Sequence, residues 1–173
     1  MPGFEIINSK ESNAVNRLFK KENGILFAHG FDNLRKNYHV REFEQNFNRK
    51  LKSKYTLAVS SGTSAIKIAL LSIGVKRGDE VITQAFNFIA TVEAILDTGA
   101  KPIIVEVDKT LNMCPIDLKK KITRKTKAIV PVHMLGVPVD LKNILALSKK
   151  KKIKVISDNC ESMGAKFNKK YIN

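Results

Sequence analysis

The sequence predicts an α/β fold: a three-layer sandwich in which helices cover both faces of a mostly parallel sheet. The first observation is that short β-branched runs alternate with amphipathic stretches from residue 55 onward. The second is that 173 residues with 43% hydrophobic content can bury one sizeable core. The third is that residues 1–54 lack this alternation. We therefore divide the chain into an N-terminal helical segment, 1–54, and an α/β domain, 55–173.

The expected strands are short apolar runs bounded by turn residues. They lie at 55–59 (YTLAV), 80–83 (EVIT), 101–107 (KPIIVEV), 126–132 (TKAIVPV) and 152–158 (KIKVISD). Helices are expected between them at 63–74, 88–98, 115–122 and 140–150. Pro115 suits the first turn of its helix and Asp140 suits an N-cap. The side chains expected on one face of the last helix are Leu141, Ile144, Leu145 and Ser148.

The first 54 residues predict helices at 9–22 and 40–52. They are joined by NGILFAHGFDNLRKNYH. A connection of this length either binds something or packs on a partner. No apolar run is long enough to span a bilayer, and the first residues, MPGFEIINSK, lack a signal-peptide core. We therefore predict a cytoplasmic protein.

Composition argues against two classes of function. Cys114 and Cys160 lack the spacing of a zinc site or a disulfide framework, so we expect two buried, reduced thiols and no metal. The net charge of +15, from 31 basic and 16 acidic residues, raises nucleic acid as a partner. The lysines, however, concentrate at expected helix ends, where cations are favoured, and no aromatic residues interleave with them. A solvated basic surface is the better interpretation.

In open α/β sheets ligands bind beyond the carboxyl ends of the strands, and the loop SSGTSA follows the first expected strand. Gly62 permits a tight turn, after which the amides and hydroxyls of Thr63 and Ser64 face outward at a helix N-terminus. This predicts an anion site, most naturally for a phosphate. The loop lacks a P-loop lysine and the spaced glycines of a dinucleotide site. A simple helix cap explains this loop alone equally well.

Two further loops lie at the same expected edge. Phe86 and Phe88 in QAFNFIAT offer rings to a planar ligand, although core packing explains each ring when it is taken alone. Asp158 ends an apolar strand, so its carboxylate needs a cation or hydrogen-bond donors, although a helix cap or turn is the simpler role. A phosphate site, a ring and a carboxylate together indicate a phosphorylated, aromatic, nitrogen-bearing cofactor.

These segments, in this order, resemble the DegT/StrS sugar aminotransferases, fold type I enzymes that use pyridoxal 5'-phosphate. The resemblance rests on SSGTSA, GDEVITQAFNFIATVEAILDTGAKPIIVEVD, KTKAIVPVHMLGVPVDL and VISDNCESMGA. It implies that Gly62, Thr63 and Ser64 bind the cofactor phosphate, that Phe88 stacks on the pyridine ring, and that Asp158 pairs with the protonated pyridine nitrogen. That pair keeps the ring cationic, so it can draw electrons from the carbon that loses its proton.

The chain departs from the family at Glu161, where glutamine is common near the phenolic oxygen of the cofactor. A carboxylate there would repel the phenolate, so Glu161 must be protonated, turned away or part of a variant chemistry. The opening residues and HGFDNLRKNYHVREFE are most similar to a subgroup that aminates an eight-carbon 3-deoxy sugar acid for lipopolysaccharide. This implies substrate or subunit contacts for Arg35 and Arg41, with exposed surface charge as the alternative. His133 is either a substrate contact or a structural histidine.

The resemblance also implies what is missing. In the family, the lysine that bonds the cofactor follows in a later segment, whereas this sequence stops at Asn173. Lys166, Lys169 and Lys170 match a hairpin instead. We therefore expect an incomplete large domain without the C-terminal small domain, an exposed sheet edge that promotes association, and an aminotransferase fragment without a Schiff-base lysine.

Whether the chain is itself an enzyme stays open at this point. The full-length family implies a sugar substrate, an amino-acid donor such as glutamate, and a homodimer. A dehydratase relative, in which histidine replaces the lysine, is one alternative. A non-catalytic remnant that associates with an intact homologue is another.

Overall fold

A computed structural model of the chain describes residues 4–21 and 38–172. It forms two compact units, Met1–Phe47 and Asn48–Asn173, which are described separately. The first contains a short 3₁₀ helix, η1 (Phe4–Ile6), the helix α1 (Ser9–Lys21) and the start of α2 (His39–Leu51). The helices expected at 9–22 and 40–52 are thus confirmed to within one residue at each end. Arg35 and most of the connection between these helices lie outside the described residues.

A capping box begins α1. The side chain of Asn8 accepts a hydrogen bond from the Lys10 amide at 3.0 Å, and its own amide donates to the Glu11 carboxylate at 2.8 Å. Both bonds satisfy amides that the first helical turn leaves without partners. In α2, the guanidinium of Arg41 lies 4.5 Å from the centre of the Tyr38 ring, a cation–π contact.

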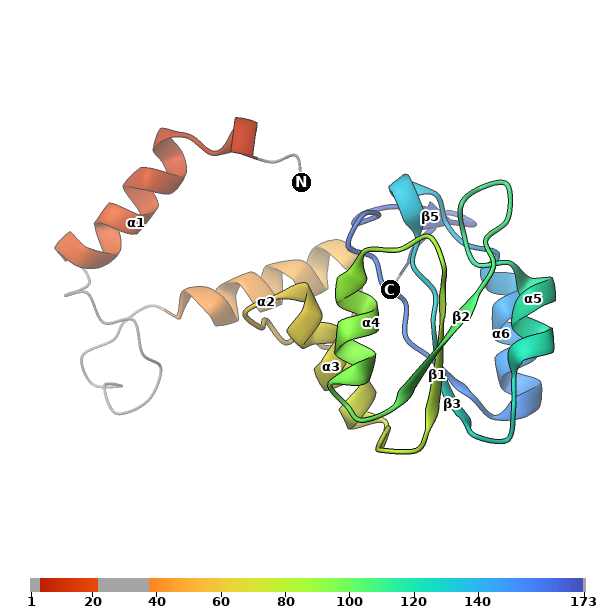
Figure 1. The fold of residues 1–173 in the computed structure, drawn as a ribbon. Helices are drawn as coiled ribbons and strands as arrows, with labels where there is room; N and C mark the ends of the chain where they lie inside the picture. Colours follow the sequence, from red (N-terminus) through yellow and green to blue (C-terminus); the bar gives the residue numbers. More distant parts are fainter. Residues whose placement is uncertain (1–3, 22–37, 173) are drawn as a thin grey trace. The chain divides into compact units, whose positions relative to one another are not determined.

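The second unit is built on a four-stranded parallel sheet in the order β2-β1-β3-β4 (Figure 1). Its strands are β1 (Glu80–Gln84), β2 (Lys101–Val105), β3 (Thr126–Val130) and β4 (Lys154–Val155). Its helices are α3 (Gly62–Ser72), α4 (Ile89–Leu96), α5 (Pro115–Lys121) and α6 (Leu141–Lys151). A second short 3₁₀ helix, η2 (Met134–Gly136), follows β3. The predicted α/β fold, its four helices and four of its five strands are confirmed.

The strand expected at 55–59 is wrong. In the described part of the chain the sheet runs from β2 to β4, and residues 55–59 belong to none of its strands. The segment still alternates, because Tyr55 and Leu57 are exposed while Thr56 and Ala58 are half-buried. The composition of this segment suits a strand, but a strand also requires a neighbour in the sheet.

Alternate residues of β1 and β3 enter different layers of the core. Val81, Ala128 and Val130 pack with Leu70 of α3 and Ile95 of α4 on one face of the sheet. On the other face, a second cluster joins the sheet to α5 and α6: Ile82, Val105, Met113, Leu118, Ile129, Val139, Ile144 and Ile153. Figure 1 shows the resulting three layers, with α3 and α4 on one side and α5 and α6 on the other.

The caps expected from the sequence set the ends of the helices on the second face. Pro115 occupies the first turn of α5. The Asp140 side chain accepts a hydrogen bond from the Asn143 amide at 3.1 Å and so begins α6. Ile144 and Ser148 of the predicted apolar face are buried, whereas Leu145 is exposed.

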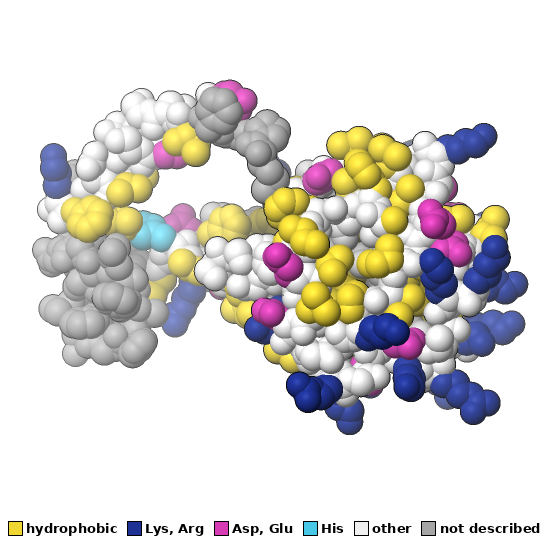
Figure 2. All heavy atoms as spheres, in the orientation of Figure 1, with side chains coloured by type: hydrophobic (Ala, Val, Ile, Leu, Met, Phe, Trp, Pro, Cys, Tyr) yellow, Lys and Arg dark blue, Asp and Glu magenta, His cyan; other side chains and the backbone are white. Residues whose placement is uncertain are grey.

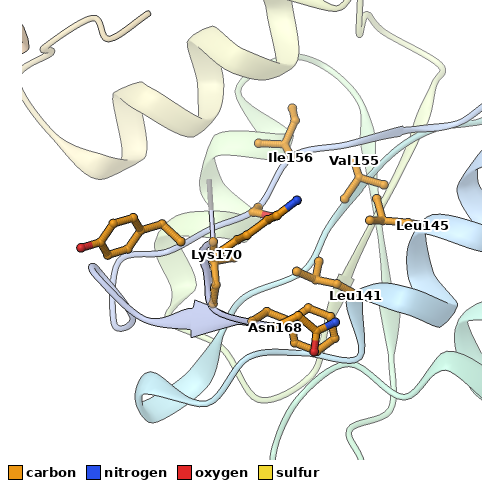
Figure 3. A pocket seen from close by; sticks show the side chains of 10 residues that line it. Leu141, Leu145, Val155, Ile156, Asn168 and Lys170 are labelled. Atoms are coloured by element: carbon orange, nitrogen blue, oxygen red, sulfur yellow. The ribbon is translucent and has the colours of Figure 1, made fainter. Parts of the chain in front are cut away.

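A groove of about 690 Å³ explains the exposure of Leu145. Leu141 and Leu145 of α6 line one side, Val155 and Ile156 line the edge of β4, and a hairpin lines the other side (Figure 3). The hairpin pairs β5 (Lys166–Phe167) with β6 (Lys170–Tyr171), as the sequence indicated for its lysines. β4 is the last strand of the described sheet, and the apolar side chains of Val155 and Ile156 beside it line this groove.

Lysines cluster in the last turns of α5 and α6. Lys119, Lys120 and Lys121 form the last turn of α5, and three further lysines form that of α6. Figure 2 shows basic side chains spread over the α5 and α6 side of the domain. Lys121 donates to the carbonyl oxygen of Ile104 at 2.7 Å and pairs with Asp117 at 3.1 Å. None of the described helices is both long and apolar enough to cross a membrane.

The sheet core makes a direct prediction about stability. Ile129 of β3 is fully buried between the sheet and the α5/α6 layer, whereas Ile116 of α5 is 71% exposed. Ile129→Ala should lower the free energy of unfolding by about 2–5 kcal/mol, because it leaves a cavity in a packed interior. Ile116→Ala should change it by less than about 0.5 kcal/mol. Urea unfolding followed by circular dichroism measures both, and equal losses would contradict the assigned core.

Candidate functional site

The direction of the helices brings three loops to one edge of the sheet. Leu70, near the end of α3, and Ile95, near the end of α4, both pack with Val81 and Ala100 at the amino-terminal ends of β1 and β2. Both helices therefore run opposite to the strands, and their N-termini lie toward the carboxyl edge. The loop after β4, which carries Asp158, reaches the same edge through its contact with α4. This is the edge at which open α/β sheets bind ligands.

The N-terminus of α3 has two amides available for an anion. Ser61 is the N-cap, and its hydroxyl oxygen accepts a hydrogen bond from the Ser64 amide at 3.1 Å. The expectation that the Ser64 amide faces outward is therefore wrong, because the cap uses it. Among the described residues, nothing accepts from the amides of Gly62 and Thr63. The Ser61 hydroxyl donates to the Ser64 oxygen at 2.9 Å, which leaves the proton of Ser64 free to donate to a ligand.

Phe88 presents an aromatic ring at the N-terminus of α4. It is the N-cap residue in an extended backbone conformation, and its side chain is 69% exposed. Phe86 is exposed as well. Core packing, the alternative role for both rings, is therefore wrong. An exposed ring at a ligand-binding edge is available to cover a planar ligand.

Asp158 is a buried carboxylate with one donor on each oxygen. The residue is 7% exposed. Its Oδ2 accepts from the Thr91 hydroxyl at 3.0 Å and its Oδ1 accepts from the Cys160 amide at 3.1 Å. Its backbone is fixed by a bridge to Val132, outside the regular ladder. The prediction that this carboxylate is buried and needs donors is confirmed.

A chain of polar side chains extends from Asp158 into the sheet. The Thr91 hydroxyl also lies 3.3 Å from Oδ1 of Asn87, whose Nδ2 donates to Thr83 at 3.2 Å. The Thr83 hydroxyl in turn donates to the carbonyl oxygen of Val130 in β3 at 2.9 Å. Sequence reasoning missed these residues. The available signal was the spacing of four between Thr83, Asn87 and Thr91, at the end of a strand and the start of a helix.

Gln84 holds the neighbouring loops in place. It is buried, and its Nε2 donates to the carbonyl oxygens of Phe86 at 3.1 Å and Leu111 at 3.2 Å. Its Oε1 accepts from the Val132 amide at 3.1 Å. One side chain at the end of β1 therefore satisfies backbone groups in three loops. Sequence reasoning assigned it no role.

Glu161 is turned toward the backbone of η2. Its Oε2 accepts a hydrogen bond from the Leu135 amide at 2.9 Å, and the residue is exposed. Of the three possibilities that the sequence left open, the structure therefore favours a carboxylate turned toward another partner. Leu135 has a φ of 52°, a left-handed conformation that this hydrogen bond helps to hold.

His133 belongs to the layer opposite Asp158. The ring is fully buried, and its Nδ1 accepts from the Val139 amide at 3.0 Å. Val139 packs with α5 and α6, whereas Asp158 contacts α4. Burial lowers the pKa of His133, and the Asp158 carboxylate partly opposes this shift. The ring is therefore neutral, with its proton on Nε2. The geometry favours the structural role, and the substrate contact stays a prediction.

The two cysteines differ from expectation. Both are free, but Cys160 is exposed and Cys114 is half-buried, so the prediction of two buried thiols is wrong. Partial burial of the Cys160 thiol, together with the hydrogen bond and negative charge of Asp158, raises its pKa to about 12. The thiol is therefore protonated at neutral pH and is a poor nucleophile. Within the described ranges, no group of three His, Cys, Asp or Glu could hold a metal ion.

Comparison with known proteins decides the family. The sequence profile of the DegT/DnrJ/EryC1/StrS aminotransferase family matches residues 28–173. The chain belongs to this family. GDP-perosamine synthase of Escherichia coli O157:H7 is 42% identical to it over 138 residues, which is 79% of this chain and 38% of that protein.

Solved structures agree with this DegT/StrS assignment. 3-Amino-5-hydroxybenzoic acid synthase superposes with a TM-score of 0.88 and 31% identity, covering 99% of this chain and 43% of that one. An Escherichia coli GDP-4-keto-6-deoxy-D-mannose-3-dehydratase, solved with bound hydrated pyridoxal phosphate, has a TM-score of 0.81 and 30% identity. It is matched by 96% of this chain, over 42% of its own length. The chain thus spans about two fifths of the relatives that it matches.

The cofactor of this DegT/StrS fold is pyridoxal phosphate. The residues at the carboxyl edge fit its groups. The amides of Gly62 and Thr63 have no other acceptor among the described residues, Phe88 offers an exposed ring, and Asp158 is a buried anion with acceptor sites to spare. An anionic phosphate, a flat ring and a protonated nitrogen match these three features.

The rate at which Cys160 is alkylated reports on the negative charge of the neighbouring Asp158. In a Cys114→Ser background, iodoacetamide should modify folded Cys160 at pH 8 at least a hundredfold more slowly than in urea. A pKa of about 12, against 9.0 for a free thiol, leaves about a thousandfold less thiolate. Asp158→Asn should accelerate the folded reaction, because it removes the negative charge beside the thiol. An unchanged rate in Asp158→Asn would contradict the assigned contact.

Proposed function

We propose that this chain is the cofactor-binding part of a pyridoxal-phosphate aminotransferase that acts on keto-sugars. The observation that carries the proposal is the buried Asp158 carboxylate at the same sheet edge as the open N-terminus of α3. A structural carboxylate this deeply buried would be expected to have a cationic partner. Within the described ranges its hydrogen-bond donors are the neutral Thr91 hydroxyl and Cys160 amide, so a protonated pyridine nitrogen would give this carboxylate a cation.

Each site residue has a distinct role in this proposal. The amides of Gly62 and Thr63 and the Ser64 hydroxyl bind the phosphate, with the positive end of the α3 dipole beneath it. Phe88 covers one face of the ring and excludes water from it. Asp158 holds the proton on the pyridine nitrogen. When bound, pyridoxal phosphate supplies an electron sink for the carbon that loses a proton.

The substrate class follows from the relatives. GDP-perosamine synthase and the dehydratase are named for nucleotide sugars. The subgroup resemblance of the first 50 residues points instead to an eight-carbon 3-deoxy sugar acid. We infer a keto-sugar acceptor of one of these two kinds and an amino-acid donor, glutamate in the first instance. A role in surface polysaccharide or lipopolysaccharide synthesis, a cytoplasmic location and a homodimer belong to the same proposal.

We also propose that the lysine which bonds the cofactor comes from polypeptide that this chain does not span. Lys166 and Lys170 lie in the β5–β6 hairpin and are exposed, and Lys169 forms its turn. Because all three lysines are exposed in a surface hairpin, we do not assign any of them the bond to the cofactor. In this proposal the chain alone binds cofactor without completing transamination.

A sugar dehydratase is the second candidate, because a solved dehydratase of this fold is 30% identical to the chain. It shares the cofactor and the nucleotide-sugar type of substrate. The two functions differ at the position of the missing lysine, which a dehydratase replaces with histidine. The described site residues have the same roles in both reactions, so they do not distinguish an aminotransferase from a dehydratase.

Binding of pyridoxamine 5'-phosphate tests the proposal, because this amine form cannot react with surface lysines. Calorimetric titration should show one site per chain. Asp158→Asn should weaken binding at least about tenfold, since it removes a charge-assisted hydrogen bond. Asp97→Asn, an exposed carboxylate at the other end of α4, is the matched control and should bind like the wild type. Absence of saturable binding to the wild type would contradict the proposal.

Glu161 gives a second test of cofactor placement. Glu161→Gln should tighten binding of pyridoxamine phosphate by about tenfold, because an amide donates to a phenolate that a carboxylate repels. Its carbonyl oxygen can still accept from Leu135. Glu161→Ala removes the charge without adding a donor. Its affinity for pyridoxamine phosphate should therefore lie between those of the wild type and Glu161→Gln. If Gln binds no more tightly than Glu, Glu161 does not face the phenolic oxygen.

A further inference from the structure

We propose that Thr91 is a positioning residue for Asp158: its hydroxyl fixes the carboxylate and follows its charge by switching between two acceptors. The identity of the cation that Asp158 meets rests on the proposed function. The hydrogen-bond arrangement itself does not. Three steps carry the inference.

The first step is that the Thr91–Asp158 contact joins two distant parts of the sequence in the interior of the fold. The two residues are 67 positions apart in the sequence and both are buried, Thr91 with 2% exposure. The Thr91 hydroxyl donates to Oδ2 of Asp158 at 3.0 Å. The Cys160 amide serves the other oxygen. One donor on each oxygen sets the plane of the carboxylate and leaves its remaining acceptor sites open.

The second step is the shortage of protons at Thr91. Its hydroxyl has one proton but two acceptors within reach, Oδ2 of Asp158 at 3.0 Å and Oδ1 of Asn87 at 3.3 Å. Asn87 is oriented by its own donation to Thr83, whose proton goes to the Val130 carbonyl. Its Oδ1 is therefore held toward Thr91. An ionised carboxylate is the stronger acceptor, so it takes the proton.

The third step is what happens when Asp158 gains a proton. The carboxylic acid then donates to the Thr91 oxygen, and Thr91 turns its own proton to Asn87. No proton is gained or lost at Thr91, and every donor keeps an acceptor. Threonine at this position therefore serves both charge states. Because Asn87 is anchored through Thr83 to β1 and β3, the sheet sets the position of the carboxylate as well as its own loop.

The ligand-bound test compares Thr91→Val, which keeps the shape and removes the hydroxyl, with Thr91→Ser, which restores it. Thr91→Val should weaken binding of pyridoxamine phosphate about tenfold. It should also shift the ¹⁵N resonance of the labelled pyridine nitrogen toward the unprotonated position. Thr91→Ser should restore both. Thr98→Val is the control, because Thr98 lies just beyond the C-terminus of α4 and its hydroxyl donates to the Ile95 carbonyl. Equal affinity and an equal resonance in Thr91→Val would overturn the proposal.

A ligand-free test separates this inference from the proposed function. Thr91→Val should lower the thermal midpoint by about 4 °C in the wild type and by clearly less in an Asp158→Asn background. Additive effects would mean that the contact is absent, and would overturn the inference whatever the ligand data show. Failure of the wild type to bind pyridoxamine phosphate would sink the proposed function, whereas non-additive midpoints would still support the Thr91–Asp158 contact.

Discussion

The buried carboxylate of Asp158 is the constraint on which the arrangement of the site depends. A charge removed from water must be compensated by donors or by a cation, or the fold loses several kcal/mol. Thr91 of α4 and the Cys160 amide supply the donors, and the bridge to Val132 fixes the backbone. Helix α4 is thereby held against the loop after β4 by a polar contact in addition to the apolar cluster around Ile95.

The parallel sheet explains why residues so far apart in sequence meet. Strands of one direction bring all their following loops to one edge, and helices that run back against them bring their N-termini there as well. Gln84 then joins three of these loops by satisfying their backbone groups. The site is therefore a consequence of the topology, which brings the loops after β1, β3 and β4 to one edge of the sheet.

The sequence predicted what depends on local pattern. The β-branched runs, Pro115 and the Asp140 cap located the strands and helices of the sheet domain, and the solvation requirement of Asp158 predicted its donors. Features that depend on non-local pairing were missed. Residues 55–59 have the pattern of a strand, but no pattern shows whether a neighbouring strand is present. The partnership of Thr91 with Asp158 across 67 positions is a property of the folded sheet alone. The exposure of Phe88 and Cys160 likewise depends on what packs beside them.

Glu161 shows how a departure from a family pattern is accommodated by the fold. An anion beside a phenolate is unfavourable, yet the side chain has a second role, because it accepts from the Leu135 amide at a left-handed backbone position. The Leu135 amide lies at the surface, where water is an alternative acceptor. The oxygen of a glutamine would satisfy it equally well. The hydrogen bond to Leu135 therefore gives an oxygen-bearing side chain at residue 161 a structural role that does not depend on its charge.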